Sequence, residues 1–253
     1  MPAVPFESVP PRLRVRAGWL IAAGAALLAA VACWSPASAG DAATPALVSV
    51  FDGATLAGWD GDPDYWRVED GCITGEATSA KPLKKNTFLL WRAGTVSDFT
   101  ITFDYRILTD WANSGLQYRS RDLGHYLVAG YQANIESGVN NGMNYSEETG
   151  RGILALVGQR VWLGDGTAKT KIEAIGERSA LLRTVKPKGE WNHYQLTAKH
   201  TTMTIWINGT LLSETIDGSV KDADQSGILA LQLHVGPPMK IQFKAFALQP
   251  LPP

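Results

Sequence analysis

From Val48 onward the chain consists of short runs in which apolar and polar residues alternate, and Gly, Asn or Asp ends each run. A period of two is typical of strands with one buried face, and turns rich in these residues join antiparallel strands. No long stretch has the period of an amphipathic helix. The pattern therefore predicts an antiparallel all-β domain.

Ten runs are predicted as strands: 65–68, 72–75, 88–91, 99–107, 115–119, 131–135, 191–199, 202–207, 227–234 and 239–247. Two hairpins are well signalled. His200-Thr201 joins 194–199 to 203–207, and Asn208-Gly209 forms a turn before 210–213. The Gly- and Asn-rich segment 136–151 is longer than a connection between strands requires, and loops of that length are often functional.

The first 39 residues are predicted to be a secretory signal peptide. A positive region precedes the apolar, Ala-rich run 17–33, and small residues follow at 37–39, as a signal-peptidase site requires. Two alternatives are a membrane anchor, for which the run is short, and a lipoprotein attached through Cys33. We expect the mature protein, residues 40–253, to be exported to the periplasm or the extracellular space and to lack a membrane span.

Length and charge limit the function classes. Residues 40–253 suffice for one well-buried domain. The full chain balances 23 Lys and Arg against 24 Asp and Glu, so no electrostatic attraction to nucleic acid or anionic lipid is expected. Cys72 is the one cysteine left after cleavage, which excludes an intramolecular disulfide and argues against a thiolate metal cluster; we expect it to be buried. The oligomeric state stays open.

Motifs for nucleotide binding, zinc proteolysis and serine hydrolysis are missing. The four histidines are scattered singly, so no metal site and no cofactor are expected. Asp60, Asp62 and Asp64 alternate as calcium ligands do, but Tyr65 replaces the Gly of an EF-hand loop and an ordinary turn is the alternative.

Four predicted strands carry polar residues that suit a binding cleft better than a solvated face. These residues, opposite apolar partners on the same strands, are Asp104, Arg106, Gln117, Arg119, Gln132, Asn134, Gln232 and His234. Planar amide and guanidinium groups form paired hydrogen bonds with sugar hydroxyls. The sequence thus favours a carbohydrate-binding face, although cross-strand hydrogen bonds or solvation would explain any one residue alone.

Ten stretches in order resemble a known family. They are VSVFDGATLAGWDG with YWRVEDGCITGE, NTFLLW, FDYRI, NSGLQYRS, GYQANI, GRGILA, EWNHYQLTAK, IWINGTL and GILALQLHVGPPMKIQFKAFAL. Over 48–248 the chain is similar to the 3-keto-disaccharide hydrolase family, also described as 3-keto-glucoside 1,2-lyases and 3-keto-2-hydroxy-glucal hydratases. The resemblance implies a jelly-roll β-sandwich of the concanavalin A and laminin G kind, whose concave face binds carbohydrate.

The resemblance also implies an enzyme that cleaves 3-keto-glucosides by elimination, by hydration of the resulting 3-keto-glucal, or by both. Its partner would be an oligosaccharide or glycoside. We expect four catalytic residues (His234, Arg119, Asp104 and Glu148) and six substrate-binding residues (Gln117, Gln132, Asn134, Gln232, Tyr131 and Trp111). His234 would act as base or acid, and Arg119 would stabilise an enolate.

Two positions depart from the family pattern. Asn134 stands where relatives often have Asp, and the Glu147-Glu148 region differs slightly in length from its counterpart. A non-catalytic carbohydrate-binding module of the laminin G type and an ordinary glycoside hydrolase remain alternatives, because a fold does not fix a function.

Overall fold

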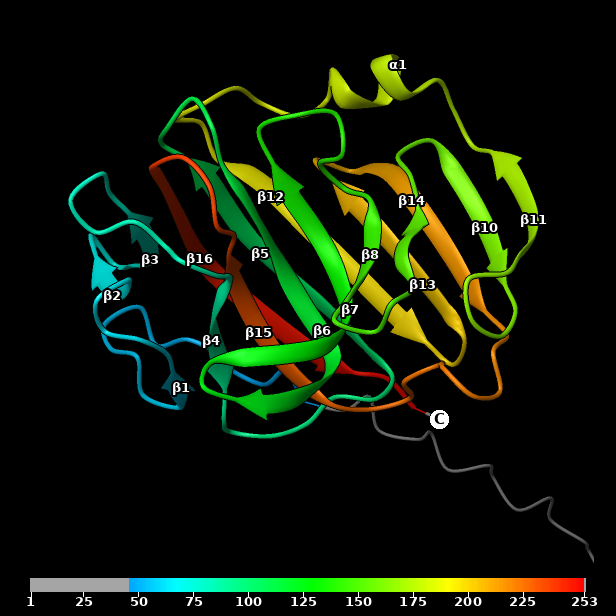
Figure 1. Ribbon diagram of the computed structural model, residues 1–253, viewed down its shortest axis with the longest axis horizontal. Helices are drawn as coiled ribbons and strands as arrows, with labels where there is room; N and C mark the ends of the chain where they lie inside the picture. Colours follow the sequence, from blue (N-terminus) through cyan, green and yellow to red (C-terminus); the bar gives the residue numbers. More distant parts are fainter. Residues whose placement is uncertain (1–45, 253) are drawn as a thin grey trace, which may run out of the picture. The chain divides into compact units, whose positions relative to one another are not determined.

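The computed structural model describes residues 46–252. Within that range the chain forms two stacked β-sheets and one short helix, α1 (Arg178–Leu182), as Figure 1 shows. The predicted all-β sandwich is therefore confirmed. The signal peptide predicted at 1–39, with Cys33, lies outside the described residues.

The seven-stranded sheet, called the front sheet after the view in Figure 1, has the order β1 (Trp59–Asp60), β4 (Thr87–Trp91), β15 (Ile228–Leu233), β6 (Asn113–Gly124), β7 (Leu127–Glu136), β8 (Asn144–Glu147) and β9 (Gly152–Ala155). The nine-stranded back sheet has the order β11 (Lys169–Ala174), β10 (Gln159–Leu163), β14 (Thr210–Asp217), β13 (Thr202–Ile207), β12 (Asn192–Lys199), β5 (Phe99–Ile107), β16 (Met239–Pro250), β3 (Cys72–Ala77) and β2 (Trp66–Glu69).

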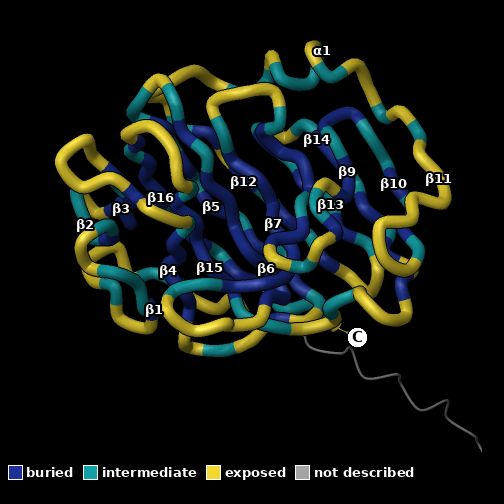
Figure 2. Tube along the Cα trace, viewed as in Figure 1, coloured by how far each residue is buried: buried dark blue, intermediate teal, exposed yellow. Residues whose placement is uncertain are grey.

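The two sheets differ in how their residues are buried. In β5 of the back sheet, buried and partly exposed residues alternate along the whole strand, because one face meets the core and the other meets solvent. In β6, β7 and β15 of the front sheet, successive residues are buried without alternation, so both faces are covered (Figure 2). The inner face packs against the back sheet.

The hairpin that joins β6 to β7 covers the part of the outer face of the front sheet that lies over β4 and β15. Its tip reaches the edge of β4, where the Phe88 N–H donates to the Tyr126 carbonyl over 3.1 Å. Arg92, just after β4, pairs with Asp122 of the hairpin. Figure 1 shows the hairpin crossing in front of β15. A small apolar cluster forms beneath it from Phe88, Leu90, Val128 and Ala230.

Each of the ten predicted strands has a counterpart, and both hairpins are confirmed, with His200 and Asn208 in the left-handed conformation that tight turns use. Strands β1, β8, β9, β10 and β11 and helix α1 were not predicted. Cys72 is buried, as expected, and is a free thiol among the described residues. Among residues 46–252 no helix is both long and apolar enough to span a membrane.

Candidate functional site

Strand register gathers four predicted site residues on the outer face of the front sheet. Gln117 lies opposite Gln132 on β7, and Gly115 lies between Asn134 of β7 and Gln232 of β15. Residues paired in this way, or two apart on a strand, point to the same face. All four polar side chains are at most 3% exposed. Their placement together agrees with the prediction.

Gly115 is needed for this arrangement. A Cβ atom there would lie 2.7 Å from Cγ of Gln132, so the Gln132 side chain occupies the space that the glycine leaves. Gln117 Nε2 donates to Gln132 Oε1 over 2.7 Å, and Gln132 Nε2 donates to Asn134 Oδ1 over 3.0 Å. Asn134 Nδ2 then donates to the Asn140 carbonyl. The chain of hydrogen bonds fixes the orientation of each amide.

A buried carboxylate belongs to the same face. Glu147, at the end of β8, accepts hydrogen bonds from Asn86 Nδ2 (3.0 Å) and Gln232 Nε2 (3.2 Å). Burial raises the pKa of Glu147; the donors and nearby His234 oppose that rise, and the charge of Glu148 adds to it. The resulting pKa lies above the usual glutamate value.

His234, partly buried, follows the last residue of β15 and is held by its main chain. Its N–H donates to the Asn113 carbonyl, and Nδ1 lies 2.6 Å from the carbonyl of Val235. A carbonyl only accepts, so Nδ1 carries the hydrogen and Nε2 is the basic nitrogen of the neutral ring. Asn86 Oδ1 accepts from the Val235 N–H, which ties this segment to the Glu147 carboxylate.

Two buried amide oxygens on this face have no partner among the described residues. They are Oε1 of Gln232 and Oδ1 of Asn113, the residue two before Gly115 on β6. A buried acceptor without a donor is costly. A hydroxyl donor would satisfy each oxygen, and because both atoms are closed to solvent, a ligand would have to displace neighbouring side chains to supply it.

The predicted placement of Arg119 beside these amides is wrong. The β6–β7 register shifts between Tyr118 and Arg121, and Arg119 adopts a left-handed φ of 47°. Such an irregularity breaks the alternation of faces on which the prediction relied. The buried guanidinium instead donates to the carbonyls of Ser97 and His200 and to the carboxylate of Asp98.

Three more predicted residues lie away from the site. Tyr131 points into the core, where its hydroxyl donates to Asp217, and Asp104 lies on the back sheet, where it pairs with His193. Glu148 is exposed, while its neighbour Glu147 provides the buried carboxylate.

Trp111, by contrast, lies next to the segment that carries His234. It is partly buried and packs against Gly236 in the loop that follows His234.

Sequence reasoning missed Asn86 and named Glu148 rather than Glu147 as a catalytic residue. Had 144–147 been predicted as a strand beside β7, alternation would have put Glu147 on the face of Gln132. Within 46–252 no three His, Cys, Asp or Glu side chains converge as metal ligands. Asp60 and Asp64 pair with different cations, Arg92 and Lys81.

Comparison with known proteins identifies relatives of this chain. Residues 46–249 match the family described as the 3-keto-alpha-glucoside-1,2-lyase-like domain. No curated protein gives a significant match.

Solved structures share the fold at low sequence identity. One Parabacteroides distasonis protein, provisionally described as a glycosyl hydrolase, is 20% identical with a TM-score of 0.51, covering 81% of this chain and 94% of its own. A second from the same species is 17% identical with a TM-score of 0.51, over 81% and 100%. A Bacillus subtilis protein of unknown function with a galectin-like fold is 11% identical with a TM-score of 0.51, over 77% and 90%.

Proposed function

The chain belongs to the 3-keto-alpha-glucoside-1,2-lyase-like family, and from this we propose that it cleaves 3-keto-glucosides by elimination across carbons 1 and 2, followed by addition of water to the product. The observation that carries the proposal is the buried Glu147 carboxylate, held by Asn86 and Gln232 near His234 on the outer face of the front sheet.

The chemistry begins at carbon 2. The ketone at carbon 3 acidifies the hydrogen on carbon 2, so a base removes that proton and leaves an enolate across carbons 2 and 3. The enolate then expels the aglycone oxygen from carbon 1, which takes a proton, and a double bond forms between carbons 1 and 2. Water adding its hydroxyl to carbon 1 and a proton to carbon 2 gives the 3-keto sugar. One base, one acid and donors for the enolate oxygen suffice.

We assign the base to His234, whose Nε2 is the basic nitrogen in the tautomer that Val235 selects. Glu147 is the acid that protonates the leaving oxygen, since burial favours its protonated form. The unpaired oxygens of Gln232 and Asn113 accept substrate hydroxyl hydrogens. The second amide hydrogen of Gln132 stabilises the enolate, the role that sequence reasoning gave to Arg119.

Turnover of a methyl 3-keto-glucoside and of the matching unoxidised glucoside tests the proposal. Wild-type protein should consume the oxidised substrate alone. Glu147→Gln and His234→Asn should each lower the rate by about 10²–10⁴-fold, the range for loss of a general acid or base. Glu148→Gln is the matched control, because it removes an exposed carboxylate one residue away, and it should retain the wild-type rate.

The same assay decides between the alternatives. Consumption of the plain glucoside would indicate an ordinary glycoside hydrolase, a mechanism that needs two carboxyl groups flanking the bond, whereas Glu147 is accompanied by an imidazole. Binding without consumption of either substrate would indicate a carbohydrate-binding module. The unpaired oxygens of Gln232 and Asn113 favour that second candidate function, because they would receive sugar hydroxyls whether or not a reaction follows.

A further inference from the structure

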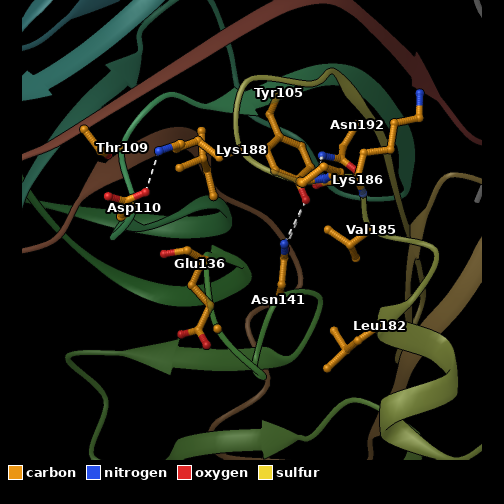
Figure 3. A pocket seen from close by; sticks show the side chains of 14 residues that line it. Tyr105, Thr109, Asp110, Glu136, Asn141, Leu182, Val185, Lys186, Lys188 and Asn192 are labelled. Atoms are coloured by element: carbon orange, nitrogen blue, oxygen red, sulfur yellow. Dashed lines mark hydrogen bonds and ion pairs between the residues drawn. The ribbon is translucent and has the colours of Figure 1, made fainter.

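A hollow with a volume of about 360 Å³ lies away from the candidate site, where segments of the two sheets meet at one end of the sandwich. Tyr105 comes from β5 of the back sheet, whereas Glu136 and Asn141 come from the end of β7 and the loop that follows it. Leu182 of α1 and Val185 close another side (Figure 3). The amides of the candidate site do not line this pocket.

The walls of the pocket differ in chemistry. Figure 3 shows Leu182 and Val185 on one side and the Lys188–Asp110 pair with Glu136 on the other. Between them, the hydroxyl of Tyr105 meets Asn141, which donates from Nδ2 over 2.9 Å. Tyr105 and Asn141 are 1% and 3% exposed, so this polar pair is fixed by its surroundings.

A pyranose ring matches these walls. Its C–H groups form an apolar surface that packs on aliphatic side chains, and its hydroxyls both donate to carboxylates and accept from amides and ammonium groups. The volume lies within the range of small-molecule sites. Lys186 and Lys188 balance Asp110 and Glu136 around the pocket. A neutral, hydroxyl-rich ligand is therefore favoured over an anion or a cation.

The pocket is connected to the candidate site through strand register. Glu136, which lines the pocket, lies opposite Asn113, and the Asn113 carbonyl accepts from the His234 main chain. Neighbouring strands are about 4.8 Å apart, so two spacings separate His234 from Glu136 by about 10 Å. Glu136 also accepts, over 3.5 Å, a hydrogen bond from Asn134 of the site. Two linked sugar rings span such a distance.

We propose that this pocket holds the leaving-group sugar of a disaccharide whose 3-keto ring occupies the outer face of the front sheet. The inference rests on the proposed function for the reaction at the first ring. In this second subsite, the aliphatic side chains of Leu182 and Val185 face the ring of the leaving-group sugar. Asn141, Lys188 and Glu136 contact the hydroxyls of the same sugar.

Kinetics with two substrates tests the subsite. Val185→Trp fills the pocket from a partly exposed position, and Tyr105→Phe removes one hydroxyl. Each should raise KM for a 3-keto-disaccharide of two glucose units, Val185→Trp by about tenfold or more, since 1.4 kcal/mol of lost binding is a factor of ten. The methyl 3-keto-glucoside lacks the second ring and loses no contact in the pocket, so its KM should stay within about twofold of the wild-type value. Equal effects on both substrates, or none on either, would overturn the inference.

If the wild type turns over neither 3-keto substrate, the proposed function is rejected but the pocket is not. A binding measurement then tests the pocket by itself. D-glucose, which is inert in the proposed reaction, is titrated into protein with labelled Leu and Val methyl groups. The Leu182 signals should shift in wild type and in Glu147→Gln, and should not shift in Val185→Trp. Mannitol, with similar hydroxyls and no ring, is the control ligand. Unshifted Leu182 signals in wild type, or equal shifts with mannitol, would reject the pocket as a pyranose site.

Discussion

Replacing Arg151 by methionine should strongly destabilise the fold, because it leaves a buried carboxylate without its cation. Arg151 pairs bidentately with Asp217 over 2.6 and 3.1 Å, and the two side chains are 3% and 1% exposed. In Arg151→Met, the Asp217 carboxylate keeps two donors among the described residues, the hydroxyl of Tyr131 and the N–H of Ser219. Removing one partner of such a pair costs about 3–5 kcal/mol. For a domain of this size that lowers Tm by about 6–20 °C.

Urea unfolding followed by tryptophan fluorescence measures the loss. Adding Asp217→Asn to Arg151→Met should recover part of it, because the uncompensated charge is then gone. Arg160→Met is the control: its partners Glu173 and Glu214 lie on the partly exposed surface, so the unfolding midpoint should change far less. An Arg151→Met midpoint as close to wild type as that of the control would refute the reasoning.

Two further predictions concern the outer face of the front sheet. Gly115→Ala should push the Gln132 side chain out of place, weaken sugar binding measured by calorimetry, and lower the free energy of unfolding by about 1–3 kcal/mol. Gly94→Ala is the control and should be nearly neutral, because its new Cβ would approach the ring of Trp91 no closer than 3.5 Å. Equal effects of the two substitutions would contradict this account. The raised pKa of Glu147 means that the unfolded chain loses this proton first, so the stability that it contributes is present below its ordinary value of 4.5 and lost as pH rises through the folded value. As the pH rises from 4.5, the free energy of unfolding measured in urea should therefore fall more steeply for wild type than for Glu147→Gln. Parallel curves for the two proteins would show that the pKa of Glu147 is not raised by folding.

Alternation predicted the sandwich because it reports which face of a strand is buried. The 99–107 run matches β5 to the residue, since one face of that strand meets the core and the other meets solvent. The same reasoning brought Gln117, Gln132, Asn134 and Gln232 to one face. It missed β8 and β9, which follow the Gly-rich stretch after Glu136. Each strand has four residues between turns, which is too few for the alternation of apolar and polar residues to be recognised.

The errors at the site have a common physical origin in backbone irregularities. Arg119 lies within a register shift, with a φ of 47°, and Glu148 has a φ of 51°, so neither side chain points where a regular strand would direct it. A single sequence gives little sign of such positions when the residue is not Gly, Asn or Asp. The position of the β6–β7 hairpin over β4 and β15 could not be predicted either, because it depends on contacts such as Arg92–Asp122 between distant segments.

The structure also explains how Asn134 fits where relatives often have aspartate. Its oxygen accepts from Gln132, and its nitrogen donates both to the Asn140 carbonyl and toward the Glu136 carboxylate. An aspartate has no hydrogen to donate, so its second oxygen would face a carbonyl and a carboxylate in a buried position, which is unfavourable. Asparagine completes the row of amides without adding charge. In the proposed reaction, the buried carboxylate is then Glu147, which Asn86 and Gln232 hold near His234.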